Sequence, residues 1–181
     1  MKQSKATDFI LPAFCAVIMT VCSWIYIPSA IPFTLQTFAV FLVTALLGAK
    51  CGLISLIIYI ALGLVGVPVF SGFNSGFGVI SGPTGGYIIG FIFIPIIYYI
   101  FNKIFKSSVV VDFSALLIGL IVCYAFGSAW FVLVYNKTGG IGIIKTLSLC
   151  VVPFIIPDLI KLSLAIVISR KTKPIIKKMD R

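Results

Sequence analysis

Residues 113–135 read FSALLIGLIVCYAFGSAWFVLVY, a stretch without one charged side chain. A bilayer core about 30 Å thick is crossed by roughly 20 consecutive apolar residues in a helix. This stretch therefore predicts a transmembrane helix. Residues 53–69, LISLIIYIALGLVGVPV, are equally free of charge, so the chain contains more than one such segment.

The composition of the whole chain agrees with a membrane protein. Of its 181 residues, 61% are hydrophobic and 10% are charged, whereas soluble domains carry about 25% charged residues. There is no histidine, and the four acids are Asp8, Asp112, Asp158 and Asp180. Acid–base or metal chemistry has few groups to use here, so we expect no catalytic residue, no metal and no cofactor.

Six apolar runs are long enough to be spans, and they predict a single all-α membrane domain. The runs cover residues 9–27, 34–48, 51–66, 85–101, 113–135 and 143–169. The second and third are short and only Ala49 and Lys50 separate them, which makes one of them a candidate re-entrant segment. The five cysteines lie within apolar segments without CxxC spacing, so we interpret them as small apolar residues.

The basic residues predict the orientation of these spans. With the N-terminus in the cytoplasm, only Lys137 and Lys145 face outward. The inner segments then hold Lys2, Lys5, Lys50, Lys103, Lys106, Arg170, Lys171, Lys173, Lys177, Lys178 and Arg181. This asymmetry satisfies the positive-inside rule with both termini cytoplasmic. The basic tail, residues 170–181, is interpreted as an orientation signal that contacts anionic lipid, not as a nucleic-acid site.

A glycine-rich segment, residues 66–86, differs from the rest of the chain. After its first glycine it reads VPVFSGFNSGFGVISGPTGG, with Pro68 and Pro83 near its two ends. Glycine and proline at this density exclude a regular helix. The topology places the segment outside, between the third and fourth spans, where its Phe and Val side chains need burial. We expect an extracellular lid that orders over a pocket; the alternative is an ordinary surface loop.

Asp158 and Lys161 form the ionisable pair placed deep in the last span. Ionisable residues inside a membrane segment are functional candidates by default. A spacing of three puts both side chains on one helical face, where they offer an acceptor and a donor to a polar ligand. The alternative is a buried ion pair that only satisfies itself.

Four polar or aromatic residues share the outer depth of the predicted bundle and could converge on one outward-facing site. They are Thr34, Gln36, Asn74 and Tyr87. Each also has an ordinary interpretation, such as helix cap, turn residue or interfacial aromatic. The Gly82–Gly86 run lacks the lysine of a phosphate-binding loop, so nucleotide binding is not expected.

Five blocks of the sequence stand out together: IPFTLQ (31–36), LLGAKCG (46–52), YIALGLVGVPVFSGF (59–73), GPTGGYIIGF (82–91) and PDLIK (157–161). In these blocks the chain resembles the BioY family, the biotin-specific substrate-binding subunits of energy-coupling factor transporters. The resemblance implies six helices and biotin binding from the outside, with Asn74, Tyr87, Asp158 and Lys161 at positions that form the site. Phe70 and Phe73, with Tyr87, would pack against the ring of biotin.

Small residues on the first span suggest a surface for a partner helix. Ala13, Ala16 and Thr20 would allow close helix approach, although packing within the bundle is equally consistent with them. Family members dock through an AxxxA pattern on this helix to a transmembrane coupling subunit driven by a pair of ATPases. The predicted function is a biotin-binding importer subunit in a bacterial cell membrane. A subunit for another vitamin, an intramembrane enzyme and a passive channel are the alternatives.

Overall fold

The structure is a computed structural model that describes residues 7–28, 32–136 and 142–179. Lys2, Lys5, Lys137 and Arg181, which entered the predicted topology, lie outside these residues. The elements in chain order are α1 (Thr7–Trp24), β1 (Tyr26–Ile27), β2 (Phe33–Thr34), α2 (Gln36–Leu47), α3 (Ala49–Leu64), η1 (Ser71–Phe73), α4 (Phe77–Ser81), α5 (Gly85–Gly90), α6 (Phe93–Ile104), α7 (Val109–Asn136), α8 (Ile143–Cys150) and α9 (Val152–Met179).

The expectation of a largely helical membrane protein is confirmed. Three helical segments of the described chain are long and apolar enough to cross a membrane: Gly85–Ile104, Val109–Tyr135 and Val152–Ile175. Shorter apolar helices occupy Ile10–Trp24, Gln36–Leu47 and Ala49–Leu64. Many large apolar side chains point outward; Ile144 is 83% exposed and Val110 is 72% exposed. Lipid, not water, is the solvent that suits such a surface.

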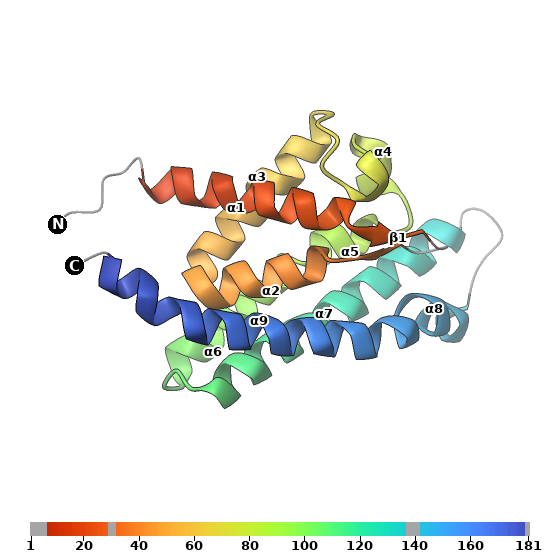
Figure 1. Cartoon of the computed structure of the whole chain (residues 1–181). Helices are drawn as coiled ribbons and strands as arrows, with labels where there is room; N and C mark the ends of the chain where they lie inside the picture. Colours follow the sequence, from red (N-terminus) through yellow and green to blue (C-terminus); the bar gives the residue numbers. More distant parts are fainter. Residues whose placement is uncertain (1–6, 29–31, 137–141, 180–181) are drawn as a thin grey trace.

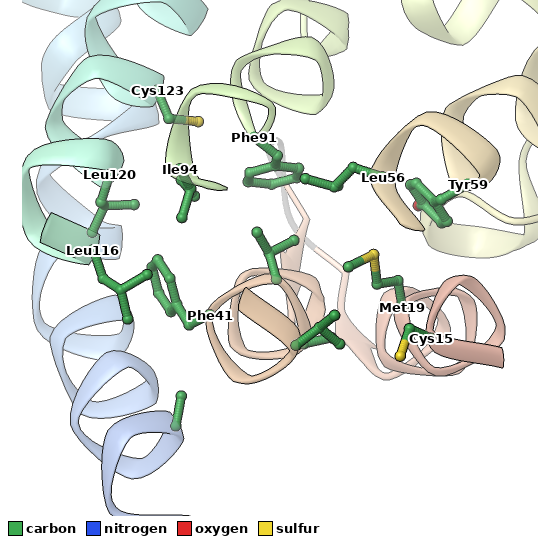
Figure 2. Packing of buried hydrophobic residues seen from close by; sticks show 14 of the residues in the cluster. Cys15, Met19, Phe41, Leu56, Tyr59, Phe91, Ile94, Leu116, Leu120 and Cys123 are labelled. Carbon is green, nitrogen blue, oxygen red and sulfur yellow. The ribbon is translucent and has the colours of Figure 1, made fainter. Parts of the chain in front are cut away.

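The start of α1, the end of α9 and the α2–α3 and α6–α7 junctions lie at one end of the bundle (Figure 1). The β1–β2 ribbon, α4 and α8 lie at the opposite end. α2 packs against α1, α3 and α9, while α7 packs against α5, α6 and α9. Figure 2 shows core side chains from these helices turned toward one another, among them Phe41 of α2 and Leu116 of α7.

Glycine and proline explain where the helices break. Gly48 ends α2 with a φ of 91°, a conformation that glycine adopts without strain, and α3 begins at the next residue. Pro95 cannot donate a backbone hydrogen bond to the carbonyl of Phe91, and α5 and α6 separate there. Pro153 likewise cannot donate to Leu149, and the apolar run at 143–169 is divided into α8 and α9 at Val151.

Three features differ from the sequence-based description. The glycine-rich segment contains a short helix, α4, as well as η1, so part of it is helical. A two-residue antiparallel ribbon pairs Tyr26 with Thr34 and Ile27 with Phe33 between α1 and α2. The basic tail continues α9 as far as Met179, because Lys and Arg are good helix formers.

Candidate functional site

The Asp158–Lys161 pair forms the charged centre of the site. Lys161 Nζ lies 2.8 Å from Asp158 Oδ1, one turn apart on α9. The Asp158 side chain is 2% exposed and that of Lys161 is 12% exposed. An isolated charge is costly to bury, and the attraction between the ammonium and the carboxylate offsets that cost here.

Three other elements contribute hydrogen bonds to this pair. The Thr37 hydroxyl, from α2, donates to Asp158 Oδ1 at 2.8 Å, and the Tyr124 hydroxyl, from α7, donates to Oδ2 at 2.6 Å. Lys161 Nζ also donates to the backbone carbonyl of Thr34 at 2.7 Å, and Thr34 belongs to β2. The pair therefore joins α2, α7, α9 and the ribbon.

A cavity opens beside this pair. Together with its mouth, the cavity spans about 680 Å³ of space free of protein atoms, open solvent included. Hydroxyl, thiol, amide and aromatic groups surround it together with the ion pair. The lining residues are Pro32, Thr34, Gln36, Thr37, Ser71, Thr84, Tyr87, Ile88, Phe91, Cys123, Tyr124, Cys150, Phe154, Asp158 and Lys161.

Tyr87 of α5 forms one wall of the cavity and is held from two sides. Its hydroxyl shares a hydrogen bond of 3.0 Å with Ser128. Its ring lies against Gly127, where an added Cβ would come within 2.2 Å of a ring carbon. A glycine at this position of α7 therefore makes room for the Tyr87 ring.

Gln36 connects the cavity to the root of the glycine-rich segment. Its side-chain amide donates to the Tyr59 hydroxyl at 3.0 Å, and that hydroxyl donates to the Val69 carbonyl at 3.1 Å. The Ser23 hydroxyl donates to the same carbonyl. A lining residue and the start of the segment thus belong to one buried network.

Five of the eight predicted ligand-binding residues line the cavity: Thr34, Gln36, Tyr87, Asp158 and Lys161. The structure does not bring the other three to it. Phe70 is 1% exposed and packs edge-on against Tyr59, with its ring over Gly63. Phe73 is 61% exposed and lies 4.9 Å from the Trp24 ring. The exposed Asn74 donates its side-chain amide to the Ser71 carbonyl at 2.8 Å.

Sequence reasoning missed Thr37, Tyr124 and Ser71, among others. Thr37 follows Gln36 within an apolar helix, and Tyr124 lies in the middle of an uncharged run, so neither stands out locally. The signal that could have found Thr37 and Tyr124 is their depth in the predicted membrane spans relative to Asp158. A hydroxyl at the level of an intramembrane carboxylate is a natural donor to it.

The predicted docking stripe on α1 is divided between two faces of the helix. Ala16 is 0% exposed and Thr20 is 7% exposed, with its hydroxyl bonded to the Ala16 carbonyl at 2.9 Å. Ala13 points outward, beside the exposed Phe14 and Val17. Ala16 and Thr20 therefore lie on the buried face of α1, which packs against α2 and α3, and of the three stripe residues only Ala13 remains on the outer surface.

The chemistry available at the cavity is recognition. Its groups can accept and donate hydrogen bonds, neutralise charge and pack against a ring. Within the described residues no group of three or more Cys, Asp or Glu side chains could hold a metal ion. The five cysteines are all free thiols, and Cys123 and Cys150 line the cavity as small apolar groups.

The family profile and the similar proteins found by sequence agree with each other. The sequence profile of the BioY family matches residues 1–178. A probable biotin transporter BioY of Pyrococcus horikoshii is 40% identical over 141 residues, which are 78% of this chain and 80% of that protein. A biotin transporter BioY of Thermotoga maritima is 39% identical over 157 residues, 86% of this chain and 89% of that protein.

A solved structure shares the fold. The crystal structure of an S-component for biotin from an ECF-type ABC transporter superposes with a TM-score of 0.84 and 30% sequence identity. The match covers 96% of this chain and 94% of that chain. The similarity therefore includes the helices that surround the cavity as well as the motifs along the sequence.

Proposed function

Because the chain belongs to the BioY family, we propose that it is the biotin-binding subunit of a vitamin importer. The observation that carries the proposal is the Asp158–Lys161 pair, buried in a multi-pass membrane protein yet lining a cavity. A purely structural pair needs no space beside it. A ligand-binding pair does.

The groups of the cavity complement those of biotin. Biotin presents two ureido N–H donors, one ureido carbonyl, an apolar thiophane ring and a carboxylate tail. Asp158 accepts from the ureido head, and Lys161 neutralises the acceptors around it. Tyr87, Phe91 and Phe154 offer apolar surface to the ring. Asn74, Phe70 and Phe73 remain predicted ligand contacts that would have to move to reach the cavity.

The topology we propose has six spans with both termini in the cytoplasm. Lys50, Lys103, Lys106 and Arg170 belong to the end of the bundle that holds the α2–α3 and α6–α7 junctions and the end of α9 (Figure 1). Lys145 belongs to α8 at the opposite end. Positive charge marks the cytoplasmic side, so the glycine-rich segment and the mouth of the cavity face outward. Biotin would enter from that side.

Transport requires partners that this chain does not supply. We propose that it assembles with a transmembrane coupling subunit and ATPase subunits of an energy-coupling factor complex, within membrane lipid. The solved S-component to which it is similar comes from an ECF-type transporter. In this proposal biotin is the ligand, no cofactor or nucleic acid takes part, and the subunit itself catalyses no reaction.

Isothermal titration of the purified protein tests the function. We expect heat of binding with biotin and none with thiamine or riboflavin at the same concentrations. Binding of another vitamin in place of biotin would keep the importer role and change the substrate. Absence of binding to biotin would overturn the assignment.

A further inference from the structure

The two oxygens of Asp158 are unequally occupied. Oδ1 accepts from Lys161 Nζ and from the Thr37 hydroxyl, each at 2.8 Å. These two donors also bond each other at 3.1 Å, which closes a small ring on that side of the carboxylate. Oδ2 accepts from the Tyr124 hydroxyl at 2.6 Å. Each donor comes from a different position in the bundle, so the carboxylate is held in one orientation.

An ionised carboxylate has about four acceptor positions, two on each oxygen. Among the described residues, three donors fill both positions on Oδ1 and one on Oδ2. One position on Oδ2 is therefore open. It lies next to the Tyr124 hydroxyl, and Tyr124 and Asp158 both line the cavity.

We propose that Thr37 and Tyr124 are specificity-determining positioning residues, which restrict Asp158 to a single hydrogen bond from the ligand. The inference rests on the proposed function, with biotin as the ligand. A cyclic urea carries its two N–H groups on opposite sides of the ring. One of them meets Oδ2, and the other must find a different partner in the cavity. The two N–H groups of biotin are thus not equivalent to this protein.

Two cyclic carbamate analogues of biotin test this. In each analogue one ureido N–H is replaced by an oxygen atom, which keeps the size of the ring and removes one donor. The wild-type protein should bind one analogue at least about tenfold more weakly than the other, because only one loses a hydrogen bond to a charged group. Equal affinities for the two analogues would overturn the proposal without touching the proposed function. Failure of the wild type to bind biotin would overturn both.

Tyr124→Phe should reduce this discrimination to within about threefold. The variant frees the second acceptor position on Oδ2, and each analogue can then turn in the cavity until its remaining N–H reaches this oxygen. A purely structural role for Tyr124 would weaken both analogues equally and leave their ratio unchanged, which would contradict the proposal. Tyr99→Phe removes a hydroxyl from an exposed position on α6 and should keep the wild-type ratio. If Tyr124→Phe does not fold, Thr37→Val opens a position on Oδ1, and the same loss of discrimination is expected.

Discussion

Asp158 is 1% exposed, and at that burial its negative charge depends on the groups around it. A charge inside a membrane protein is expensive unless it is paired and hydrogen-bonded. Lys161, Thr37 and Tyr124, all groups of the chain itself, provide that compensation. The fold thus holds the carboxylate in place, which lowers the ordering cost that a ligand must overcome.

Removing the charge of Asp158 should weaken binding much more than removing an exterior charge. We expect Asp158→Asn to lose roughly tenfold or more in biotin affinity, because hydrogen bonds to a charged group contribute about 1.5–3 kcal/mol. Lys50→Gln, at an exposed position on α3, should leave affinity unchanged. Titration calorimetry compares the two variants. Equal affinities would show that the Asp158–Lys161 pair serves only stability.

Gly127 should be as important to the cavity as the residues that line it. In Gly127→Ala the new methyl group would overlap the Tyr87 ring, with a closest approach of 2.2 Å. Overpacking of this kind costs about 1–3 kcal/mol, and here it would displace the cavity wall. We expect weaker biotin binding in a folded protein. Gly142→Ala is the matched control, since a Cβ there meets nothing within 4 Å; equal binding by both variants would argue against the role of Tyr87.

For single residues, the sequence predicts which charged side chains belong to the site better than it predicts the neutral ones. Asp158 and Lys161 could be found because ionisable groups within an apolar span are rare and their spacing of three fixes a common face. Thr37 and Tyr124 contact Asp158 only through the packing of α2 and α7 against α9, which no local pattern contains. Phe70 was predicted to face the ligand, but the structure buries its ring against Gly63 and Tyr59.

The glycine-rich segment is attached at both of its ends. At the first, the Trp24 side chain donates to the Pro68 carbonyl at 2.8 Å, and Tyr59 donates to the carbonyl of Val69. At the second, the Trp130 side chain donates to the Gly82 carbonyl at 3.0 Å. Between these anchors Phe77 is 72% exposed. Any closing movement is therefore expected between the anchors and not at them.

Hydrogen exchange with and without biotin would locate this movement. We expect biotin to slow exchange in residues 71–81, because the exposed aromatic side chains of this stretch would pack over the bound ligand. Val67, Val69 and Phe70 should be protected in both states, because their amide N–H groups already donate to backbone carbonyls and the Phe70 side chain is buried. The same protection in both states along the whole segment would identify a rigid cap.

The helices α7 and α9 are joined by polar contacts at two levels. Tyr124 bonds Asp158 near the cavity, while Asp112 Oδ2 accepts from Arg170 at 2.6 Å toward the other end. The Tyr98 hydroxyl also donates to Asp112, at 2.8 Å, so each buried aspartate has a tyrosine and a cation from α9. The levels are twelve residues apart on both helices, or about 18 Å. The two helices therefore keep one antiparallel register.

Loss of the Asp112–Arg170 ion pair should destabilise the protein without removing any residue of the ligand site. Arg170→Gln leaves a carboxylate that is 1% exposed without its cation. Removing one partner of a buried pair costs about 3–5 kcal/mol, and we expect about 2–3 kcal/mol because the Arg170 side chain is 34% exposed. Thermal unfolding in detergent measures this loss, with exposed Lys171→Gln as the control. A melting temperature equal to that of the control would show that the pair contributes nothing.

Apolar runs predict helices well but give no signal of their interruptions. The runs at 85–101 and 143–169 contain breaks at Phe91 and Val151, and the prolines responsible, Pro95 and Pro153, resemble tolerated helix prolines when only the sequence is read. The α4 helix lies among glycines that argue against any helix. Its single turn is supported by surrounding contacts, with Ile80 buried at its inner face. Tertiary packing decides such cases.

At the scale of the whole molecule, the outer surface of α1 is the one on which the family resemblance predicts a partner. Because lipid gives no hydrophobic drive between helices, close approach at a small residue must supply the contact. Ala13 is the outward-facing small residue of the predicted stripe, whereas Ala16 and Thr20 are committed to the interior. The docking surface that remains is centred on Ala13, with Phe14 and Val17 beside it.

Bulk at Ala13 should therefore block assembly without affecting the ligand site. We expect Ala13→Trp to bind biotin like the wild type but to lose copurification with the coupling subunit and ATPases. Ala16→Trp should behave differently, because a position that is 0% exposed has no room for an indole ring; the expected result is loss of folded protein. Ile144→Trp, at an 83% exposed position on α8, controls for added bulk on the outer surface and should retain both properties. Copurification of Ala13→Trp at the wild-type level would place the interface on another face of the bundle. A folded Ala16→Trp that binds biotin and has lost its partners would instead return Ala16 to the docking surface.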